Sequence, residues 1–147
     1  MAARWLERLW EEQTGRTSVQ VLNEYYVTLT DKMNPPVPAE DAWDDVKSFI
    51  AWNPQPIDGE LLHRGREIEH RYRLSWWDSL IVGAAQLQNC VLLLTEDLQD
   101  RSVYGSVTVR NPFIFGVTED LAHYSVEKTR GRTHPRRGRP KRVRPAA

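Results

Sequence analysis

The sequence predicts an α/β domain of three layers, in which helices flank a short parallel sheet. Two observations lead to this fold class. Amphipathic helical patterns fill most of the chain up to residue 89, and the apolar run CVLLLT follows them at residues 90–95. This run is too short for a helix and does not alternate apolar with polar residues. It is typical of a strand that is buried on both faces of a parallel sheet.

Hydrophobic periodicity predicts two amphipathic helices at the start of the chain. The first spans residues 3–13 and carries two tryptophans on its apolar face. The second spans residues 18–32 and begins at a hydroxyl N-cap, either Thr17 or Ser18. It ends at the proline-rich segment NPPVP, residues 34–38, because proline does not continue a helix.

Three more helices are expected before the apolar strand, which makes five. The third is stopped by Pro54 and Pro56, the fourth begins near Asp58, and the fifth starts in the stretch RLSWWDSLIVGAA at 73–85 and ends near Gln88. The apolar residues that mark the third helix are Ala42, Val46, Phe49 and Ile50, and those of the fourth are Leu61, Gly65, Ile68 and Tyr72.

Two further strand candidates complete the predicted sheet, RTS at 16–18 and SVTV at 106–109. A chain of 147 residues is long enough to bury the core of one domain. Its single cysteine, Cys90, forms no internal disulfide, so we expect a cytoplasmic protein. No apolar run approaches the about 20 residues that span a bilayer, so we expect no membrane segment.

The neutral net charge of the chain conceals two segments of opposite charge. Residues 126–147 carry nine Lys and Arg against one acid, Glu127, a net charge of +8, so the preceding 125 residues carry −8. The basic segment has almost no apolar residues and three prolines, so it buries too little surface to offset the entropy of ordering. We therefore expect a domain over residues 1–125 and a disordered basic tail over 126–147.

Asp78 raises a question, because it shares a helical face with Ile81, Val82 and Ala85, positions that normally point at a core. A charge on such a face is costly unless another group pairs with it. One interpretation is a capping box, in which Ser75 caps the helix and Asp78 reaches back to it. The other is that Asp78 belongs to a functional site.

Acidic residues also occur at two other points where a site is expected. The turn TEDLQD, residues 95–100, directly follows the buried strand, where ligands bind in α/β sheets, although its acids also suit a solvated turn. Glu24 interrupts an apolar and aromatic stretch of the second helix. Three acids from separate elements suit a hard cation such as Mg²⁺ or Mn²⁺, whereas one cysteine and four scattered histidines give no zinc spacing.

Four segments together resemble the PIN domain, and specifically the VapC-type toxins of toxin–antitoxin pairs. They are TSVQVLNEYYVTLT (17–30), RYRLSWWDSLIVGAAQL (71–87), LLLTEDLQD (92–100) and VTVRNPF (107–113). The resemblance implies an endoribonuclease that hydrolyses RNA with carboxylate-bound Mg²⁺ or Mn²⁺. It implies Glu24, Asp78 and Asp97 as metal ligands and catalytic residues, and Asp100 as a fourth catalytic candidate.

The same resemblance implies partners and exposes one departure from the family. It implies an RNA substrate, neutralisation by a VapB-type antitoxin, and a homodimer. The family begins with a central apolar strand that ends in an aspartate, whereas this sequence starts at the helix that follows, so the first central strand and one ligand are missing. A misassigned start, a truncated and decayed copy, or a strand supplied in trans each account for this. The alternative function is an inactive PIN remnant that binds nucleic acid or an antitoxin.

The basic tail extends beyond the family pattern. Its segment RGRPK resembles an AT-hook, which would contact the DNA minor groove and phosphates through Arg137, Arg139 and Lys141. The other interpretation is a generic basic extension without a selected role. Either kind of basic arm binds nucleic acid through salt-sensitive phosphate contacts.

Overall fold

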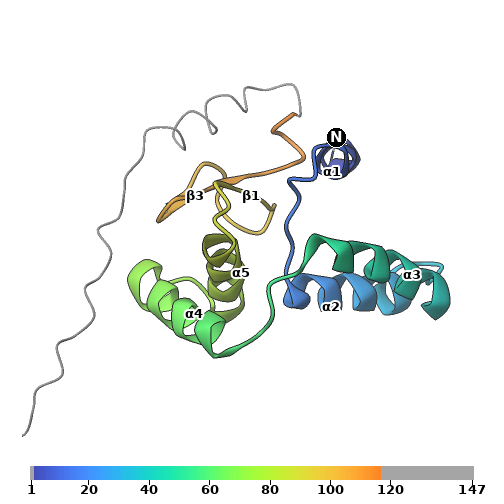
Figure 1. Ribbon diagram of the computed structural model, residues 1–147, viewed down its shortest axis with the longest axis horizontal. Coiled ribbons are helices and arrows are strands. Elements are labelled where there is room, and N and C mark those ends of the chain that lie inside the picture. Colours follow the sequence, from blue (N-terminus) through green and yellow to red (C-terminus); the bar gives the residue numbers. More distant parts are fainter. Residues whose placement is uncertain (1, 117–147) are drawn as a thin grey trace, which may run out of the picture.

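The computed structural model describes residues 2–116, which form an α/β fold in which α5 packs against a small sheet (Figure 1). Five α-helices lie in this part of the chain: α1 (Ala2–Glu11), α2 (Val19–Val27), α3 (Ala39–Phe49), α4 (Gly59–Tyr72) and α5 (Trp76–Leu87). The strands are β1 (Leu92–Leu94), β2 (Val103–Tyr104) and β3 (Val107–Arg110). The predicted α/β class and the five helices are thus confirmed.

Side-chain caps set the starts of the helices that carry the site and its support. Ser18, not Thr17, caps α2, where its hydroxyl accepts a hydrogen bond from the Val21 amide at 3.3 Å. Asp58 caps α4 in the same way, as expected of a residue that satisfies an otherwise unpaired first-turn amide. The predicted second helix continues past α2 as a π-helical turn, Thr28–Lys32.

The sheet is mixed and has the strand order β1-β3-β2. The predicted parallel pairing is confirmed for β1 and β3, where Leu93 lies opposite Val109. The antiparallel strand β2 was not predicted, because two residues are too short to show an alternating pattern. A tight turn at Gly105, whose φ of +63° suits glycine, joins β2 to β3. This order leaves β1 at one edge of the sheet.

Helix α5 lies between α4 and the sheet and forms the centre of the core. Its residue Val82 is fully buried in one cluster with Ile68 of α4 and with Tyr104 and Val109 of the sheet. A second cluster joins α5 to α4 through Leu61, Leu80 and Ala84. Figure 1 shows both helices on the same side of the strands. These contacts fix the position at which α5 begins.

Helix α1 connects the segment after β3 to α3 through aromatic side chains. The Trp5 ring stacks on Phe115 with a centroid distance of 5.3 Å, and Trp5 Nε1 donates a hydrogen bond to the Phe115 carbonyl at 2.8 Å. At the other end of the helix, Trp10 lies 5.5 Å from Phe49 and 4.9 Å from Trp52. The apolar face predicted for this helix therefore packs at both ends.

The expected domain boundary at residue 125 and the basic tail, with Arg137, Arg139 and Lys141, lie outside the described residues. The extended segment expected at residues 16–18 is reduced to a single parallel bridge between Ser18 and Gln55. Among residues 2–116, no helix is both long enough and apolar enough to cross a membrane.

We predict that Gly15→Ala destabilises the fold. A Cβ at this position would lie 2.5 Å from two atoms of the Trp52 indole, a rigid ring that also packs on Trp10. Overpacking of this kind costs about 1–3 kcal/mol, so the thermal midpoint should fall by several degrees. Gly59→Ala is the matched control, because a Cβ there meets no atom within 4 Å. Equal midpoints for the two variants would contradict the packing described.

Candidate active site

Asp78 lies in the first turn of α5 and is half-buried. The Ser75 hydroxyl accepts a hydrogen bond from the Asp78 amide at 3.1 Å and donates one to Asp78 Oδ2 at 2.7 Å. The capping interpretation is therefore confirmed for Ser75, although Asp78 bonds to the Ser75 hydroxyl in place of the expected backbone amide. Asp78 Oδ1 has no hydrogen-bond partner within residues 2–116.

Gln20 links Glu24 to the start of α5. It is 94% buried, and its Nε2 lies 3.3 Å from Glu24 Oε1, one helical turn along α2, and 3.4 Å from the Trp77 carbonyl. A buried amide needs hydrogen-bond partners, and these two contacts provide them from separate helices. The Gln20 side chain thereby connects the backbone of Trp77, which precedes Asp78, to Glu24.

The sequence alone did not single out Gln20. The signal was present: a polar residue lies one turn before Glu24, between Val19 and Val21, and on the buried face of an amphipathic helix. Its partner on α5 is separated from it by 57 residues, and periodicity does not report contacts at that range. The structure supplies this connection.

Asp97 and Asp100 lie in the turn after β1 but have different surroundings. Asp97 is exposed, and its amide donates to the Thr95 hydroxyl at 3.1 Å. In the described part of the chain, its carboxylate forms no hydrogen bond or ion pair. Asp100, in contrast, accepts from the Asn111 amide at 2.8 Å and from Arg110 Nε at 3.0 Å.

The contacts of Asp100 hold the turn against the end of β3. The hydrogen bond from the Asn111 amide is the largest influence that lowers the pKa of Asp100, and Arg110 and Arg101 also lower it against an opposing effect of desolvation. The Arg110 guanidinium lies 3.9 Å from the centre of the Phe115 ring. Asp100 therefore does more than solvate the turn, since it connects β3 to the segment on which α1 packs.

The oxygen donors of this region suit Mg²⁺ or Mn²⁺. Glu24 and Asp78 belong to helices that Gln20 connects, whereas Asp97 and Asp100 come from the turn after β1. Among residues 2–116, no group of three or more His, Cys, Asp or Glu side chains is placed to hold a metal ion. Mg²⁺ is commonly bound by one or two carboxylates together with water and substrate phosphate, so such an ion does not require a group of three acids.

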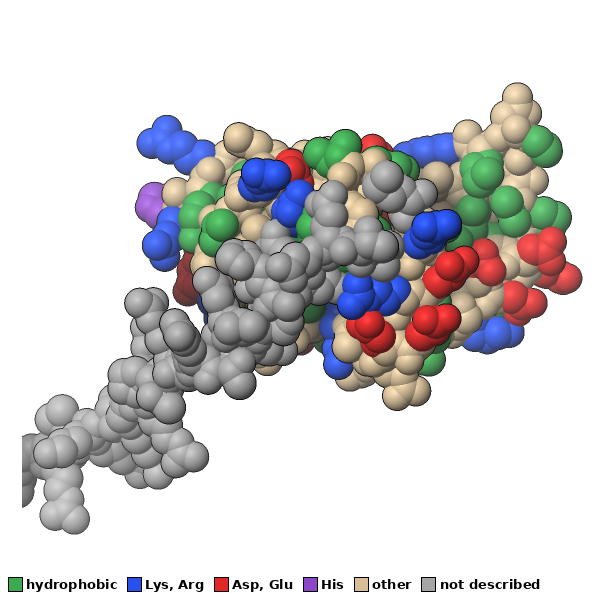
Figure 2. All heavy atoms as spheres, turned by 90° about the horizontal axis from the view of Figure 1, so that it is seen from above, with side chains coloured by type: hydrophobic (Ala, Val, Ile, Leu, Met, Phe, Trp, Pro, Cys, Tyr) green, Lys and Arg blue, Asp and Glu red, His purple; other side chains and the backbone are tan. Residues whose placement is uncertain are grey.

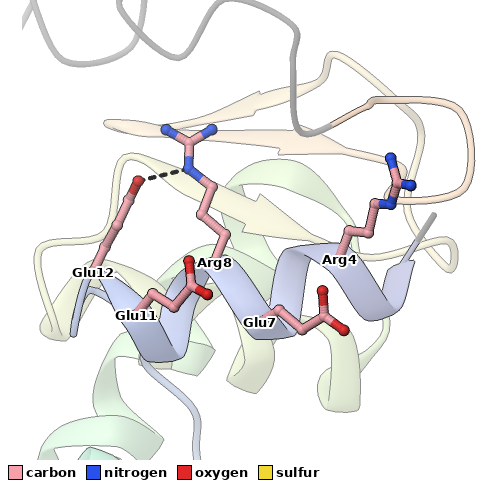
Figure 3. Close-up of a pocket in the computed structure, with 5 residues that line it drawn as sticks. All are labelled: Arg4, Glu7, Arg8, Glu11 and Glu12. Atoms are coloured by element: carbon pink, nitrogen blue, oxygen red, sulfur yellow. Dashed lines mark hydrogen bonds and ion pairs between the residues drawn. The ribbon is translucent and has the colours of Figure 1, made fainter.

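A second concentration of charge covers α1 but has a structural explanation. Figure 3 shows acidic and basic side chains interspersed along the exposed side of this helix. Arg8 and Glu12, one turn apart, form an ion pair of 2.7 Å. Interspersed charges with pairs at this spacing are typical of a solvent-exposed helix face.

Comparison with protein families matches residues 2–105 to the PIN domain. This span includes most of the described chain and contains all four predicted site acids. A comparison with curated proteins finds no match. The family match was anticipated from the segments around the helix acids and the turn after β1.

We predict that Asp100→Asn destabilises the protein in a pH-dependent way. Because the pKa of Asp100 is lowered in the folded state, its contribution to stability is present above the ordinary carboxyl pKa of about 3.9 and is lost as the pH falls through the lowered value. The midpoint difference from the wild type should be largest near neutral pH and should shrink in acid. Thermal melts from neutral to acid pH measure this difference, with Asp97→Asn as the control. Equal midpoints for the two variants at every pH would contradict the prediction.

Proposed function

The chain belongs to the PIN domain family, a family of nucleases, and we propose that it is a metal-dependent endoribonuclease of the VapC toxin class. The observation that carries this proposal is the connection of Glu24 to the start of α5 through the buried Gln20. Gln20 thereby connects the two helices that carry these carboxylates. The VapC class itself rests on the sequence segments around these acids.

The residues of the chain have separate parts in the proposed reaction. In this proposal Glu24 and Asp78 hold Mg²⁺ or Mn²⁺. Asp97 and Asp100 are the further candidates from the turn after β1, although within residues 2–116 no three acids are placed to share one ion. When bound, such an ion activates water and stabilises negative charge on the phosphate. Gln20 orients the Glu24 carboxylate, and the Ser75 hydroxyl fixes one oxygen of Asp78 so that the other is available.

The partners in this proposal follow from the class. We propose RNA as the substrate, a VapB-type antitoxin as the inhibitor, a homodimer as the assembly, and the cytoplasm as the location. The basic tail, with Arg137, Arg139 and Lys141, adds a contact with DNA. The charges of these side chains support an affinity for phosphates.

We predict that millimolar Mn²⁺ raises the thermal midpoint, because an ion that binds only the folded state stabilises it by mass action. Asp78→Asn and Glu24→Gln should each remove this shift and lower RNA cleavage on the order of a hundredfold. Gln20→Leu should weaken metal affinity by only about tenfold, because it removes the side chain that orients Glu24 but leaves both ligands in place. Glu67→Gln is the control, because this exposed acid on α4 lies outside the proposed site. A shift that persists in Asp78→Asn would contradict the proposed ligand set.

A second candidate function is a PIN domain that binds nucleic acid or an antitoxin without cleaving. It is favoured by the absence of a three-acid group within residues 2–116. The position of β1 is relevant to whether the chain cleaves RNA or only binds it. Within the described sheet, β1 pairs with β3 on one side and has no partner strand on the other. In the segment before β1, Gln88 Nε2 donates to the Thr17 carbonyl at 3.0 Å, and the buried Gln88 Oε1 has no partner among the described residues.

We predict that an added strand distinguishes the two candidates. An apolar strand that ends in aspartate, fused ahead of residue 1, should pair with β1, raise the thermal midpoint, and increase metal-dependent RNA cleavage over the 147-residue chain. The same fusion with asparagine at its end is the control, because it closes the sheet without adding a ligand. Equal cleavage by both fusions would contradict the role of the added acid. If neither form cleaves any RNA tested, the endoribonuclease proposal is contradicted and the binding function is favoured.

A further inference from the structure

Two adjacent tryptophans at the start of α5 have opposite surroundings. Trp76 is half-buried against the cluster of Leu61, Leu80 and Ala84. Trp77 is 64% exposed, the highest value for a large apolar side chain within residues 2–116. The core therefore uses Trp76, and the packing of the fold gives no reason for a tryptophan at position 77.

The backbone of Trp77 is tied to the proposed site. The Trp77 carbonyl accepts the hydrogen bond from Gln20 that also connects to Glu24, and the next residue is Asp78. Its backbone is held by this contact and by the first turn of a buried helix. A large aromatic face on a fixed backbone loses little conformational freedom when a planar ligand stacks on it.

Cationic side chains precede Trp77 by a few residues. Arg73 ends α4 in a left-handed conformation with φ of +55°, is exposed, and forms no ion pair in the described part of the chain. Arg71 is also exposed and lies 5.3 Å from the centre of the Tyr72 ring. Figure 2 shows Lys, Arg and His side chains at the end of the molecule where α4 lies, with acidic side chains among them. Arg71 and Arg73 thus place two cations at the junction of α4 and α5, close in sequence to the acids Glu69 and Asp78.

We propose that Trp77 stacks on a base of single-stranded RNA bound at the Glu24 and Asp78 site, and that Arg73 contacts an adjacent phosphate. This inference rests on the proposed function and adds a residue that binds the substrate. An aromatic face beside a cation is the combination by which proteins bind unpaired nucleotides, because the ring takes any base and the cation takes the backbone. Carboxylates alone repel a phosphate chain, so these two side chains supply the attraction for RNA.

The test measures RNA binding separately from cleavage. The full chain is titrated with a fluorescent single-stranded RNA of eight nucleotides in EDTA, and Kd is read from anisotropy. Trp77→Ala should raise Kd on the order of tenfold, and Trp77→Phe should restore most of the affinity. Trp43→Ala is the matched control, because Trp43 is 50% exposed and belongs to α3, outside the α4–α5 junction. In Mg²⁺, Trp77→Ala should raise KM for cleavage while kcat is retained.

A base-deletion series separates stacking from a structural effect. A set of RNAs is prepared, each of which lacks the base at one position. The wild type should bind one member of this set more weakly than the intact RNA, whereas Trp77→Ala should bind that member and the intact RNA equally. Arg73→Gln should reduce the dependence of Kd on salt. Thermal melts of both variants are expected to match the wild type.

The outcomes distinguish this inference from the proposed function. If RNA is bound and cleaved equally by the wild type and Trp77→Ala, the inference is wrong and the proposed function stands. If the wild type neither binds nor cleaves any RNA tested, both are wrong. If Trp77→Ala alters the oligomeric state on size-exclusion chromatography and leaves Kd unchanged, Trp77 contacts protein and the stacking role is excluded.

Discussion

The burial of α5 between α4 and the sheet is the constraint on which the rest of the structure depends. This helix packs Val82 toward β3 and Leu80 toward α4, so that it is enclosed on two sides. Close approach to α4 requires small residues: a Cβ on Gly65 would lie 2.7 Å from Leu80, and one on Gly83 would lie 3.2 Å from Arg64. A helix held this tightly has one permitted register. The positions of Trp77 and Asp78 at its start follow from that register.

The side chains around the candidate site combine structural and chemical parts. Ser75 begins α5 and also holds the Asp78 carboxylate, and Gln20 satisfies its own buried amide while it contacts Glu24. Asp100 is an acid of the same turn as Asp97, yet Arg110 and Asn111 hold it in place. The two acids of this turn therefore differ: Asp100 stabilises the fold, whereas Asp97 is accessible to a ligand.

The sequence predicts the helices because their periodicity and their hydroxyl or carboxylate caps are local properties. It locates β1 and β3 within two residues because each is a short apolar run, but it misses β2, which is defined only by its pairing with β3. The acids Glu24 and Asp78 were identified because each interrupts an apolar pattern. Gln20 and the partners of Asp100 were not, since these contacts depend on how distant segments come together and leave no periodic signal.

The carboxylates of the proposed site have hydrogen-bond partners within the protein. Asp78, in the first turn of α5, accepts a hydrogen bond from the Ser75 hydroxyl, and Gln20 offers an N–H to Glu24. This arrangement differs from a structural zinc site, where the domain does not fold until the metal binds its ligands. Packing around α5 stabilises the domain, and Glu24 and Asp78 supply the chemistry proposed for it, so the stability and the proposed chemistry depend on different side chains.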